Sequence, residues 1–428
     1  MRMLDRRARP WRTFATVMVS VAVLGGCSSP ASDSGQSGYD DGTNVPAPLY
    51  PTASDAQIVA AAAKAMNPSI DVSRLAPEVR TVFASAALPL TAEQESIWQR
   101  CIAEPICDTG QGTKTIALID DLQSPFYSIS AGEFYAQAIQ SGQVRKIIHS
   151  STNSDLSQYL STFRQAIAQD VDLIFSEMST LGRQAGPVLA QAKAAGIPVV
   201  NGATLLDREQ AKYLAVELRA SPCDMWKTVA PKLTEHLKQK GITNPTYSMF
   251  SGPAGNAYAA SWQPCAEKEL NPLGWSKVYT GYDTWTQQGQ AQAASALLAS
   301  GTKPDVILTD DNPSQFLQTY ANAQQQIPLI MSAGSVQINT LKAYLAAEKA
   351  GGKPDVWAMS SQPVMWRLAV VAGLEIADGQ QPSSNPINYP MDAVSFADLV
   401  KTADLTIDGN ANAGSLLSPS QQNEALKH

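Results

Sequence analysis

The stretch VDLIFSEMSTLGRQAGPVLAQAKAAGIPVV, residues 171–200, decides the fold class. Residues 171–175 are apolar except for Asp172, and a second apolar run begins at Ile197. Such short runs without polar alternation are typical of parallel strands that are covered on both faces. Between them, the pattern at 181–195 predicts a helix that ends at Gly196. Together these segments predict a parallel β-α-β unit.

The same pattern continues on both sides of this stretch. In the first half we expect strands at 115–119, 144–149, 171–175 and 197–201, and helices at 128–140, 155–169 and 181–195. In the second half we expect strands at 246–250, 276–279, 306–309 and 327–331, and helices at 222–239, 257–270, 287–299 and 314–323. The sequence therefore predicts an α/β protein with two successive Rossmann-like lobes, each on a parallel sheet. Because ligands bind beyond the carboxyl ends of such strands, we expect a cleft that closes about a hinge.

The N-terminus has the pattern of an export signal. Five arginines within residues 1–12 precede an apolar stretch at 13–23, and Leu24-Gly25-Gly26-Cys27 follows. A membrane span needs about twenty apolar residues, so this shorter stretch indicates a secretory signal. The four residues that end at Cys27 resemble a bacterial lipobox, which implies cleavage after residue 26 and a lipid on Cys27. An ordinary signal peptide that contains a cysteine by chance is the alternative.

The charge of the chain excludes one class of partner. The net charge is −7, and residues 1–26 contain five arginines and one aspartate, so the chain from Cys27 onward carries about −11. Nucleic acids need a basic face, and anionic lipid surfaces attract basic segments. We therefore expect no nucleic-acid partner, and we expect the lipid on Cys27 to hold the protein at the membrane.

Four further cysteines indicate disulfides, because an exported chain with an even number of cysteines usually pairs them. Three pairings are possible, and we favour Cys101 with Cys107 and Cys223 with Cys265. A metal site is not expected, since the cysteine spacings do not resemble zinc pairs. The histidines, at 149, 236 and 428, are also far apart in the sequence.

Several segments, taken in order, resemble the sugar-type (type I) periplasmic binding proteins, the ribose and galactose binders of ABC importers. Six segments carry the resemblance. In the first half they are an opening strand with its loop and long helix, a valine-aspartate strand, and an alanine-glycine-isoleucine-proline-valine segment. In the second half they are a glycine loop, a strand before two aspartates, and a glutamine-proline step. These segments are 115–142, 171–175, 194–200, 252–256, 304–311 and 361–363, with the helix at 364–377. The resemblance implies the type I fold, with two Rossmann-like lobes joined by a multi-strand hinge.

The resemblance also places the ligand between the lobes. Sugars present flat apolar faces and rings of hydroxyls, which aromatic rings and amide or carboxylate groups bind. By loop position, the expected stacking residues are Phe126 and Trp285, with Tyr127 nearby, and the expected polar contacts are Asp121, Glu177, Asn201, Asn256, Asp310, Asp311 and Gln362. The alternatives are structural: Phe126 packs under its loop, Trp285 begins a helix in the core, Asp310 or Asp311 caps the next helix, and Asn201 is a turn residue.

The chain departs from this family at three places. Asn201-Gly202 stands where aspartate-arginine is usual, Ser261-Trp262-Gln263 stands where an arginine is usual, and Ser332-Ala333-Gly334-Ser335 replaces an expected aspartate. The pocket thus lacks several charged anchors and gains Trp262 as a candidate. We expect a sugar, a polyol or another small neutral ligand.

Domain boundaries follow from these patterns. We assign 1–26 to the signal, 27–51 to a flexible polar stalk, 52–112 to an alanine-rich helical extension, 113–220 with 336–385 to the first lobe, 221–335 with 386–406 to the second, and 407–428 to a poorly ordered polar tail. The segment 335–355 is longer than the family's connection and predicts a helix at 338–349.

An enzyme is disfavoured, because no histidine stands beside a nucleophile as a triad requires. The nearest candidate, His149 before Ser150 and Ser151, is interpreted as part of a solvated loop, and the adjacent Asp310 and Asp311 would diverge, unlike a glycosidase pair. We expect a monomeric, lipid-anchored receptor without cofactor or metal that delivers its ligand to ABC permease subunits. A lipoprotein that presents its bound form to a membrane receptor is the alternative, and an extracytoplasmic hydrolase is a weaker one.

Overall fold

The computed structural model of the 428-residue chain describes residues 50–428, except 179–181, 203–205, 221, 335 and 361. The expected signal sequence, the lipobox with Cys27 and the stalk up to residue 49 lie outside the described residues. Tyr50, assigned to the stalk, is buried in the core of the first lobe, so that boundary is corrected. In the described part of the chain, no helix is long and apolar enough to cross a membrane.

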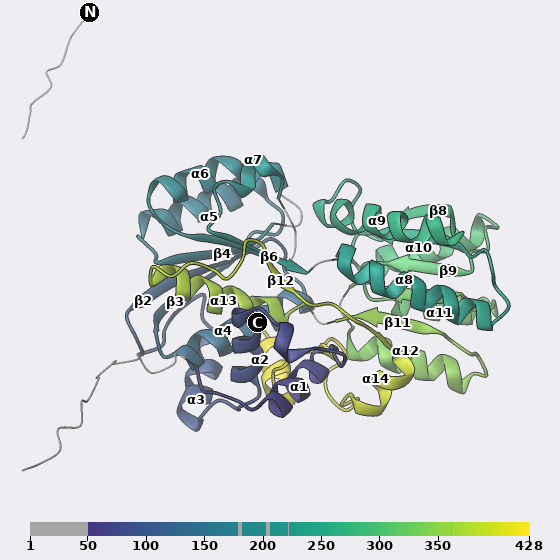
Figure 1. Ribbon diagram of the computed structural model, residues 1–428, viewed down its shortest axis with the longest axis horizontal. Coiled ribbons are helices and arrows are strands. Elements are labelled where there is room, and N and C mark those ends of the chain that lie inside the picture. Colours follow the sequence, from purple (N-terminus) through teal and green to yellow (C-terminus); the bar gives the residue numbers. More distant parts are fainter. Residues whose placement is uncertain (1–49, 179–181, 203–205, 221, 335, 361) are drawn as a thin grey trace, which may run out of the picture. The chain divides into compact units, whose positions relative to one another are not determined.

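The first lobe is built on a seven-stranded sheet (Figure 1) in the order β1-β3-β2-β4-β5-β6-β12. These strands are β1 (Ile106–Asp108), β2 (Lys114–Asp120), β3 (Val144–Ser151), β4 (Leu173–Glu177), β5 (Val199–Gly202), β6 (Val216–Ala220) and β12 (Ile387–Tyr389). Their pairs are parallel except for β1 with β3.

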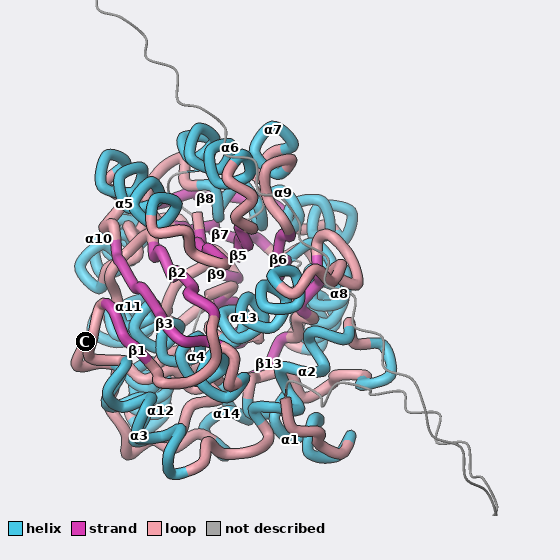
Figure 2. Tube along the Cα trace, turned by 90° about the vertical axis from the view of Figure 1, so that its left-hand side faces the viewer, coloured by secondary structure: helices cyan, strands magenta, loops and turns pink. Residues whose placement is uncertain are grey.

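Helices cover both faces of this sheet. Helices α4 (Pro125–Ser141) and α13 (Val364–Ala377) pack on one face, and α5 (Leu156–Ala168) and α6 (Gly186–Ala194) on the other, with η2 (Gly182–Ala185) and α7 (Arg208–Ala211) in the connections. Figure 2 shows β2 and β3 between α5 on one side and α4 on the other. This burial on both faces explains the apolar runs of the strands, since a solvated face would require polar alternation.

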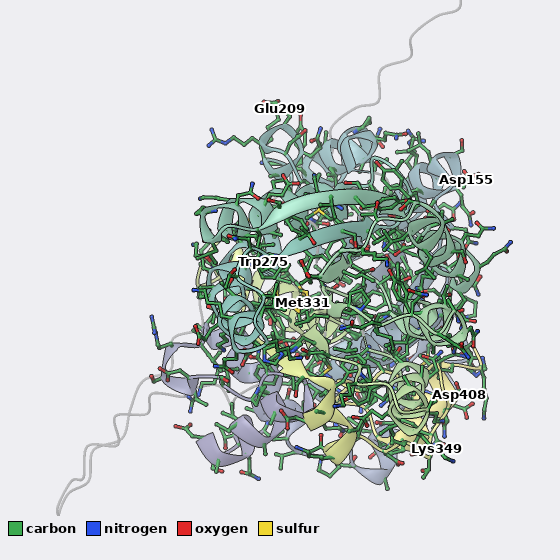
Figure 3. The ribbon with its side chains drawn as sticks, turned by 90° about the vertical axis from the view of Figure 1, so that its right-hand side faces the viewer. Asp155, Glu209, Trp275, Met331, Lys349 and Asp408 are labelled. Atoms are coloured by element: carbon green, nitrogen blue, oxygen red, sulfur yellow. A yellow bond between two sulfur atoms is a disulfide. The ribbon has the colours of Figure 1, made fainter. Side chains whose placement is uncertain are left out.

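The second lobe repeats the plan with a six-stranded sheet in the order β13-β11-β10-β9-β7-β8. Its strands are β7 (Thr246–Ser251), β8 (Ser276–Tyr282), β9 (Val306–Thr309), β10 (Leu329–Ser332), β11 (Val356–Met359) and the antiparallel β13 (Ala393–Ser395). One face packs on α8 (Pro222–Gln239) and α9 (Ala257–Leu270), in a core that includes Trp275 and Met331 (Figure 3). The other packs on α10 (Gln287–Ala299), α11 (Ser314–Asn322), α12 (Ile338–Lys349) and α14 (Phe396–Thr402), and η3 (Asn271–Leu273) follows α9. The predicted fold class is confirmed.

Two lobe boundaries from the sequence are wrong. Residues 336–385 were assigned to the first lobe, yet α12 packs in the second lobe and β11 pairs with β10 there. Residues 386–406 were assigned to the second lobe, yet β12 pairs with β6 of the first. The strands β11, β12 and β13 have three or four residues each and carry no strong pattern, so the later points where the chain crosses between lobes were misplaced.

The helical extension is part of the first lobe's core. It contains α1 (Asp55–Lys64), η1 (Val72–Arg74), α2 (Pro77–Ala86) and α3 (Ala92–Cys101), and β1 ends it as an edge strand of the sheet. Helix α2 packs on α13, and α3 packs on α4. Behind α1, Asn67 Nδ2 donates to Pro390 O at 2.6 Å, and Ser360 Oγ donates to Met66 O at 3.1 Å. The extension therefore contacts two of the segments that join the lobes.

The C-terminal tail is ordered, contrary to the expectation from its polar sequence. Ile407 and Ala411 pack into the second lobe, whereas Leu417 packs into the first. Helix α15 (Pro419–Ala425) then lies on α4. A Cβ at Gly132 of α4 would lie 2.8 Å from Leu417 Cδ1, so that close approach requires the glycine. The tail thus adds a further connection between the lobes.

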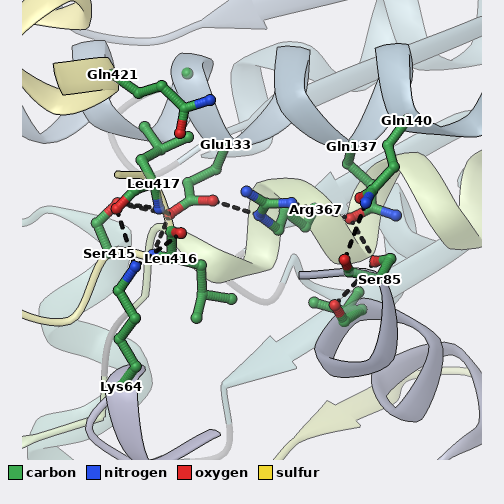
Figure 4. A network of polar contacts seen from close by, with 12 residues as sticks. Lys64, Ser85, Glu133, Gln137, Gln140, Arg367, Ser415, Leu416, Leu417 and Gln421 are labelled. Atoms are coloured by element: carbon green, nitrogen blue, oxygen red, sulfur yellow. Dashed lines mark hydrogen bonds and ion pairs between the residues drawn. The ribbon is translucent and has the colours of Figure 1, made fainter. Parts of the chain in front are cut away.

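A buried ion pair joins the tail to the helices of the first lobe (Figure 4). Glu133 of α4 accepts from Arg367 Nε of α13, and both side chains are buried. The second carboxylate oxygen accepts from Ser415 Oγ at 2.6 Å and from Leu416 N at 2.7 Å. The Glu133 charge is therefore neutralised by one cation and further stabilised by donors from the tail.

Two disulfides join the four described cysteines in the favoured pairing. Cys101 is bonded to Cys107, which ties α3 to β1. Cys223 is bonded to Cys265, which ties α8 to α9. The prediction of two disulfides is confirmed.

We predict that Arg367→Met lowers the free energy of unfolding by about 3–5 kcal/mol, because it leaves the Glu133 carboxylate buried without its cation. The double variant Glu133→Gln with Arg367→Met should recover most of that loss, because it removes the charge as well. Urea denaturation measures both. As a control, Arg80→Met breaks an exposed pair with Asp55 and should cost at most about 1 kcal/mol. Equal losses for Arg367→Met and Arg80→Met would contradict the assignment.

Candidate functional site

The candidate site lies where the strand order of each sheet reverses direction. In the first lobe, β2 has β3 on one side and β4 on the other, so the chain passes from β2 to β3 and then crosses to the opposite side of β2. In the second lobe, β7 lies in the same way between β8 and β9. Open parallel sheets bind ligands at such points, beyond the carboxyl ends of the strands. A cleft of about 390 Å³ lies there, lined by residues of both lobes. This volume is in the range that small-molecule sites occupy.

The structure brings seven of the eleven sequence-predicted ligand residues to this cleft. They are Phe126, Tyr127 and Glu177 from the first lobe, Trp285, Asp310 and Asp311 from the second, and Gln362 from a segment that joins them. Glu177 is the last residue of β4, and each of the others stands in a loop after a strand or in the first turn of the next helix, which is where the parallel arrangement predicts side chains to converge.

Four predicted residues do not line the cleft. Asp121 and Asn201 are buried at the ends of β2 and β5, and Asn201 is a strand residue rather than a turn residue. Asn256 caps α9, where its Oδ1 accepts from Ala259 N at 2.6 Å. Trp262 lies on the inner face of α9 and is fully buried, so it is a core residue and not an added pocket wall.

Several lining residues were missed by the sequence interpretation. Among them are Tyr258, Thr284, Gln290, Gln337 and Asn410. Tyr258 in the first turn of α9 had a usable signal, namely an aromatic residue directly after the glycine loop. Asn410 had none, because only the folded path of the tail brings it to the cleft.

Aromatic rings form the first-lobe wall. Phe126 contacts Tyr127 and Trp366 edge to face, at centroid distances of 5.2 and 5.5 Å. Tyr127 OH donates to Glu177 Oε2 at 2.6 Å, which orients both side chains. Phe126 is half-buried, so it packs on its neighbours and still lines the cleft.

The indole of Trp285 forms an opposing wall and is held by unusual backbone geometry. Thr284 and Trp285 both have left-handed φ values, of 54° and 53°. Such conformations cost free energy in residues other than glycine and often occur at functional sites. The indole packs directly on Gly252, where an added Cβ would lie 2.3 Å from the ring. A glycine at 252 is therefore required by the position of the ring.

Asp310 is held by three neutral donors. Its Oδ2 accepts from Ser251 Oγ and from Trp262 Nε1, the latter at 2.8 Å, and its Oδ1 accepts from Trp285 Nε1 at 2.9 Å. The capping alternative is excluded for both aspartates, because α11 begins after Pro313 without a side-chain cap. Burial raises the pKa of Asp310 to about 6, although these donors oppose the shift.

Two more carboxyls lie close to Asp310. Asp311 accepts from Gln290 Nε2 and from Asn312 N, and Asp283 accepts from Trp285 N at 3.1 Å and Thr309 Oγ1 at 3.3 Å. Burial raises the pKa of Asp311. Burial, together with repulsion from Asp311 and Asp310, raises the pKa of Asp283 to about 8.

Backbone also forms part of the wall. Gly334 lines the cleft just after β10, where the family pattern has an aspartate. A Cβ at Gly334 would lie 2.2 Å from Asp310 O, so no side chain fits there. Beside it, Ala333 O accepts from Tyr258 OH at 3.0 Å and from Gln362 Nε2 at 3.2 Å.

The arrangement offers binding groups rather than a catalytic set. His149 lies in β3, in agreement with the predicted strand, and β3 continues to Ser151, so the interpretation of this segment as a solvated loop is wrong. The Nε2 of His149 contacts Asp120 Oδ2 at 2.7 Å. Neither residue belongs to a serine or cysteine triad among the described contacts. No group of three or more histidine, cysteine, aspartate or glutamate residues in the described ranges is placed to hold a metal ion.

Comparisons with known proteins agree with this geometry. A family model described as "Periplasmic binding protein domain" matches residues 117–381. A search of curated protein sequences found no match. The family and the solved structures below are binding proteins by description rather than enzymes.

Three solved structures illustrate the similarity. An ABC transporter solute-binding protein from Bacillus halodurans C-125 with bound myo-inositol has a TM-score of 0.56 and 15% identity, over 68% of this chain and 97% of that one. One from Actinobacillus succinogenes 130z with bound D-allose gives 0.55 and 16%, over 66% and 97%. One from Mycobacterium smegmatis with bound glycerol gives 0.57 and 18%, over 67% and 96%. At these identities the similarity establishes the fold.

We predict that Asp283 makes the ligand-free protein less stable as the pH rises from about 4 to about 8. Its pKa is about 8 in the folded protein and has an ordinary value of 3.8, so between these pH values the carboxyl is protonated in the folded state and ionised in the unfolded state. The free energy of unfolding therefore decreases as the pH rises through this window. Asp283→Asn removes this contribution. The decrease in urea midpoint between the two ends of the window should be smaller in Asp283→Asn than in the unmodified protein, and an equal decrease would contradict the raised pKa.

Proposed function

The chain belongs to the periplasmic binding protein family, whose model matches more than half of it, and from this premise we propose that it is a lipid-anchored solute-binding protein of an ABC importer. It captures a sugar, a polyol or a similar small ligand in the cleft between its lobes, outside the cytoplasmic membrane. Capture is noncovalent, and ATP hydrolysis occurs in other subunits.

One observation carries this proposal: the cleft combines aromatic and polar groups from both lobes. Phe126 and Tyr127 come from the first lobe, and Trp285 and Asp310 come from the second. A ring with an apolar face and polar substituents fits such walls, because the rings provide contact area and the carboxylates fix orientation. Because the two lobes contribute opposite walls, a bound ligand favours the closed state over the open one.

Two further lines support the location and the partner. Export and lipid attachment rest on the sequence that ends at Cys27, which matches a lipobox after a short apolar segment. The importer rests on the printed descriptions of the structural neighbours, which are ABC transporter solute-binding proteins with bound myo-inositol, D-allose or glycerol.

We predict that Trp285→Ala and Phe126→Ala each weaken ligand binding at least about tenfold, because each removes an aromatic wall of the cleft. Calorimetry against a panel of pentoses, hexoses, cyclitols and small polyols first identifies a ligand and then measures the variants. Tyr282→Ala is the control, because Tyr282 is exposed on β8 and does not line the cleft. Failure of the whole panel to bind, or affinity unaffected by both variants, would contradict the proposed function.

We predict that Cys27→Ala abolishes lipid attachment and releases the protein from the membrane fraction, since Cys27 is the proposed site of the lipid. Metabolic labelling with a radioactive fatty acid and mass spectrometry of the mature N-terminus measure this. Ser29→Ala, two residues later, should remain labelled and membrane-bound. Labelling that persists in Cys27→Ala would show that the anchor lies elsewhere.

A further inference from the structure

The cleft is acidic on both sides. Its described lining contains three carboxylates, Glu177, Asp310 and Asp311, and no lysine, arginine or histidine. Asp283 lies directly behind the second-lobe wall and hydrogen bonds to Trp285 N. None of the described cations faces Asp283, Asp310 or Asp311. After burial, repulsion from Asp311 and Asp310 contributes to the raised pKa of Asp283, and repulsion from Asp311 contributes to that of Asp310. A cation that entered would relieve this repulsion.

Three side-chain donors of the cleft are already used within its walls. Trp285 Nε1 donates to Asp310, and Gln290 Nε2 donates to Asp311. Gln362 Nε2 donates to Tyr258 OH and to Ala333 O. Sugar hydroxyls both donate and accept, so a wall built for neutral sugars would offer donors as well as acceptors. The part of the second-lobe wall formed by Asp310, Asp311 and Gln290 Oε1 offers mainly acceptors.

One acceptor at this wall has no partner. Gln290 is only 3% exposed and lines the cleft, and its Oε1 receives no hydrogen bond. A buried acceptor without a donor costs free energy, so a donor from the ligand would be favoured here. The Asp311 carboxylate accepts from Nε2 of the same Gln290 side chain. Gln290 Oε1 and the Asp311 carboxylate are therefore close together, and one donor group on a ligand would lie near both.

A bare metal ion does not fit these carboxylates. Metal sites need several ligands that converge on one point, and no described group of acidic, histidine or cysteine residues does so. The oxygens of Asp310 are instead directed to three neutral donors. An organic cation, which carries its charge on a larger frame, does not need such convergence.

Aromatic rings in the same cleft suit an organic cation. Phe126, Tyr127 and Trp285 line it together with the carboxylates. The faces of aromatic rings attract ammonium groups, tryptophan most strongly. A charged amine donates up to three hydrogen bonds and accepts none, which matches the acceptors at Asp310, Asp311 and Gln290 Oε1.

We propose that the ligand is an amino-substituted sugar or cyclitol whose ammonium group is bound by the second-lobe wall at Asp311, Asp310 and Gln290 Oε1, with the ring between Phe126 and Trp285. This inference rests on the proposed function and specifies its ligand class. In the sequence, the absence of the family's usual charged residues at 201–202 and 261–263 indicated a neutral ligand. In the folded protein, no described cation opposes the second-lobe carboxylates Asp310 and Asp311, and the ligand itself supplies the compensating charge.

The test compares matched pairs that differ by one hydroxyl-to-ammonium replacement. Calorimetry on the purified protein, at a pH at which the amines are charged, measures D-glucose against D-glucosamine, D-galactose against D-galactosamine, and scyllo-inositol against scyllo-inosamine. N-acetyl-D-glucosamine tests the nitrogen without its charge, and putrescine tests charge without a ring. At least one amine should bind about tenfold or more tightly than its hydroxyl partner, with the N-acetyl compound weaker.

Two variants locate the charge recognition. Asp311→Asn should bring the ratio of amine to hydroxyl affinity close to one, and Gln290→Met, which removes the unpartnered acceptor, should lower the same ratio. Thermal unfolding checks that each variant is folded. Glu235→Gln is the matched control, because it removes an exposed acidic charge on α8 that does not line the cleft, and it should keep the ratio.

The outcomes separate this inference from the proposed function. Hydroxyl partners that bind as tightly as the amines, or a ratio unchanged in both Asp311→Asn and Gln290→Met, would overturn the inference and leave a neutral-sugar receptor. Putrescine binding with no ring compound bound would support ammonium recognition and contradict the sugar or polyol class. No binding by any compound would overturn both.

Discussion

The constraint on which this structure depends is that parallel strands end at a common edge. In each lobe, the carboxyl ends of the central strands, β2 with β4 and β7 with β9, meet at one place. Buried carboxyl groups such as Glu177 and Asp310 stand at these ends and not in the middle of the strands. The sheet interior is apolar on both faces, so polar groups that recognise a ligand are tolerated only where the strands stop. The cleft therefore lies at the carboxyl ends of the strands.

Buried charge is treated differently in the two lobes. Glu133 in the first lobe is paired with Arg367 and with donors from the tail, and this pairing holds α4, α13 and the C-terminal segment together. Asp310 in the second lobe has only neutral donors and lies close to Asp283 and Asp311. The first arrangement is internally compensated and therefore structural. The second lacks a counter-charge within the described protein, which is the property expected of a group that awaits a ligand.

The sequence predicted the long elements well and the short ones poorly. Helices α8, α9, α10, α12 and α13 begin and end at the residues predicted for them, because each is long enough for its apolar residues to identify it within the chain. Strands β11, β12 and β13 have three or four residues each, and their pairing depends on partners far away in the chain. The tail was misjudged for the same reason: Leu417 is apolar within a polar segment, and only the groove beside Gly132 buries it.

By itself, the sequence determined the α/β class, the two lobes and seven of the residues that line the cleft, because loop positions after parallel strands are fixed by local pattern. It favoured the disulfide pairing that the structure has, although three pairings were possible. Only the tertiary structure decided that Trp262 supports Asp310 from the core, that Asn410 reaches the cleft and that Gln290 meets Asp311. It alone also decided the charge balance of the site. The physical reason is that burial and the distance between charges, which set pKa values and donor supply, are properties of the folded arrangement and leave no local pattern in the chain.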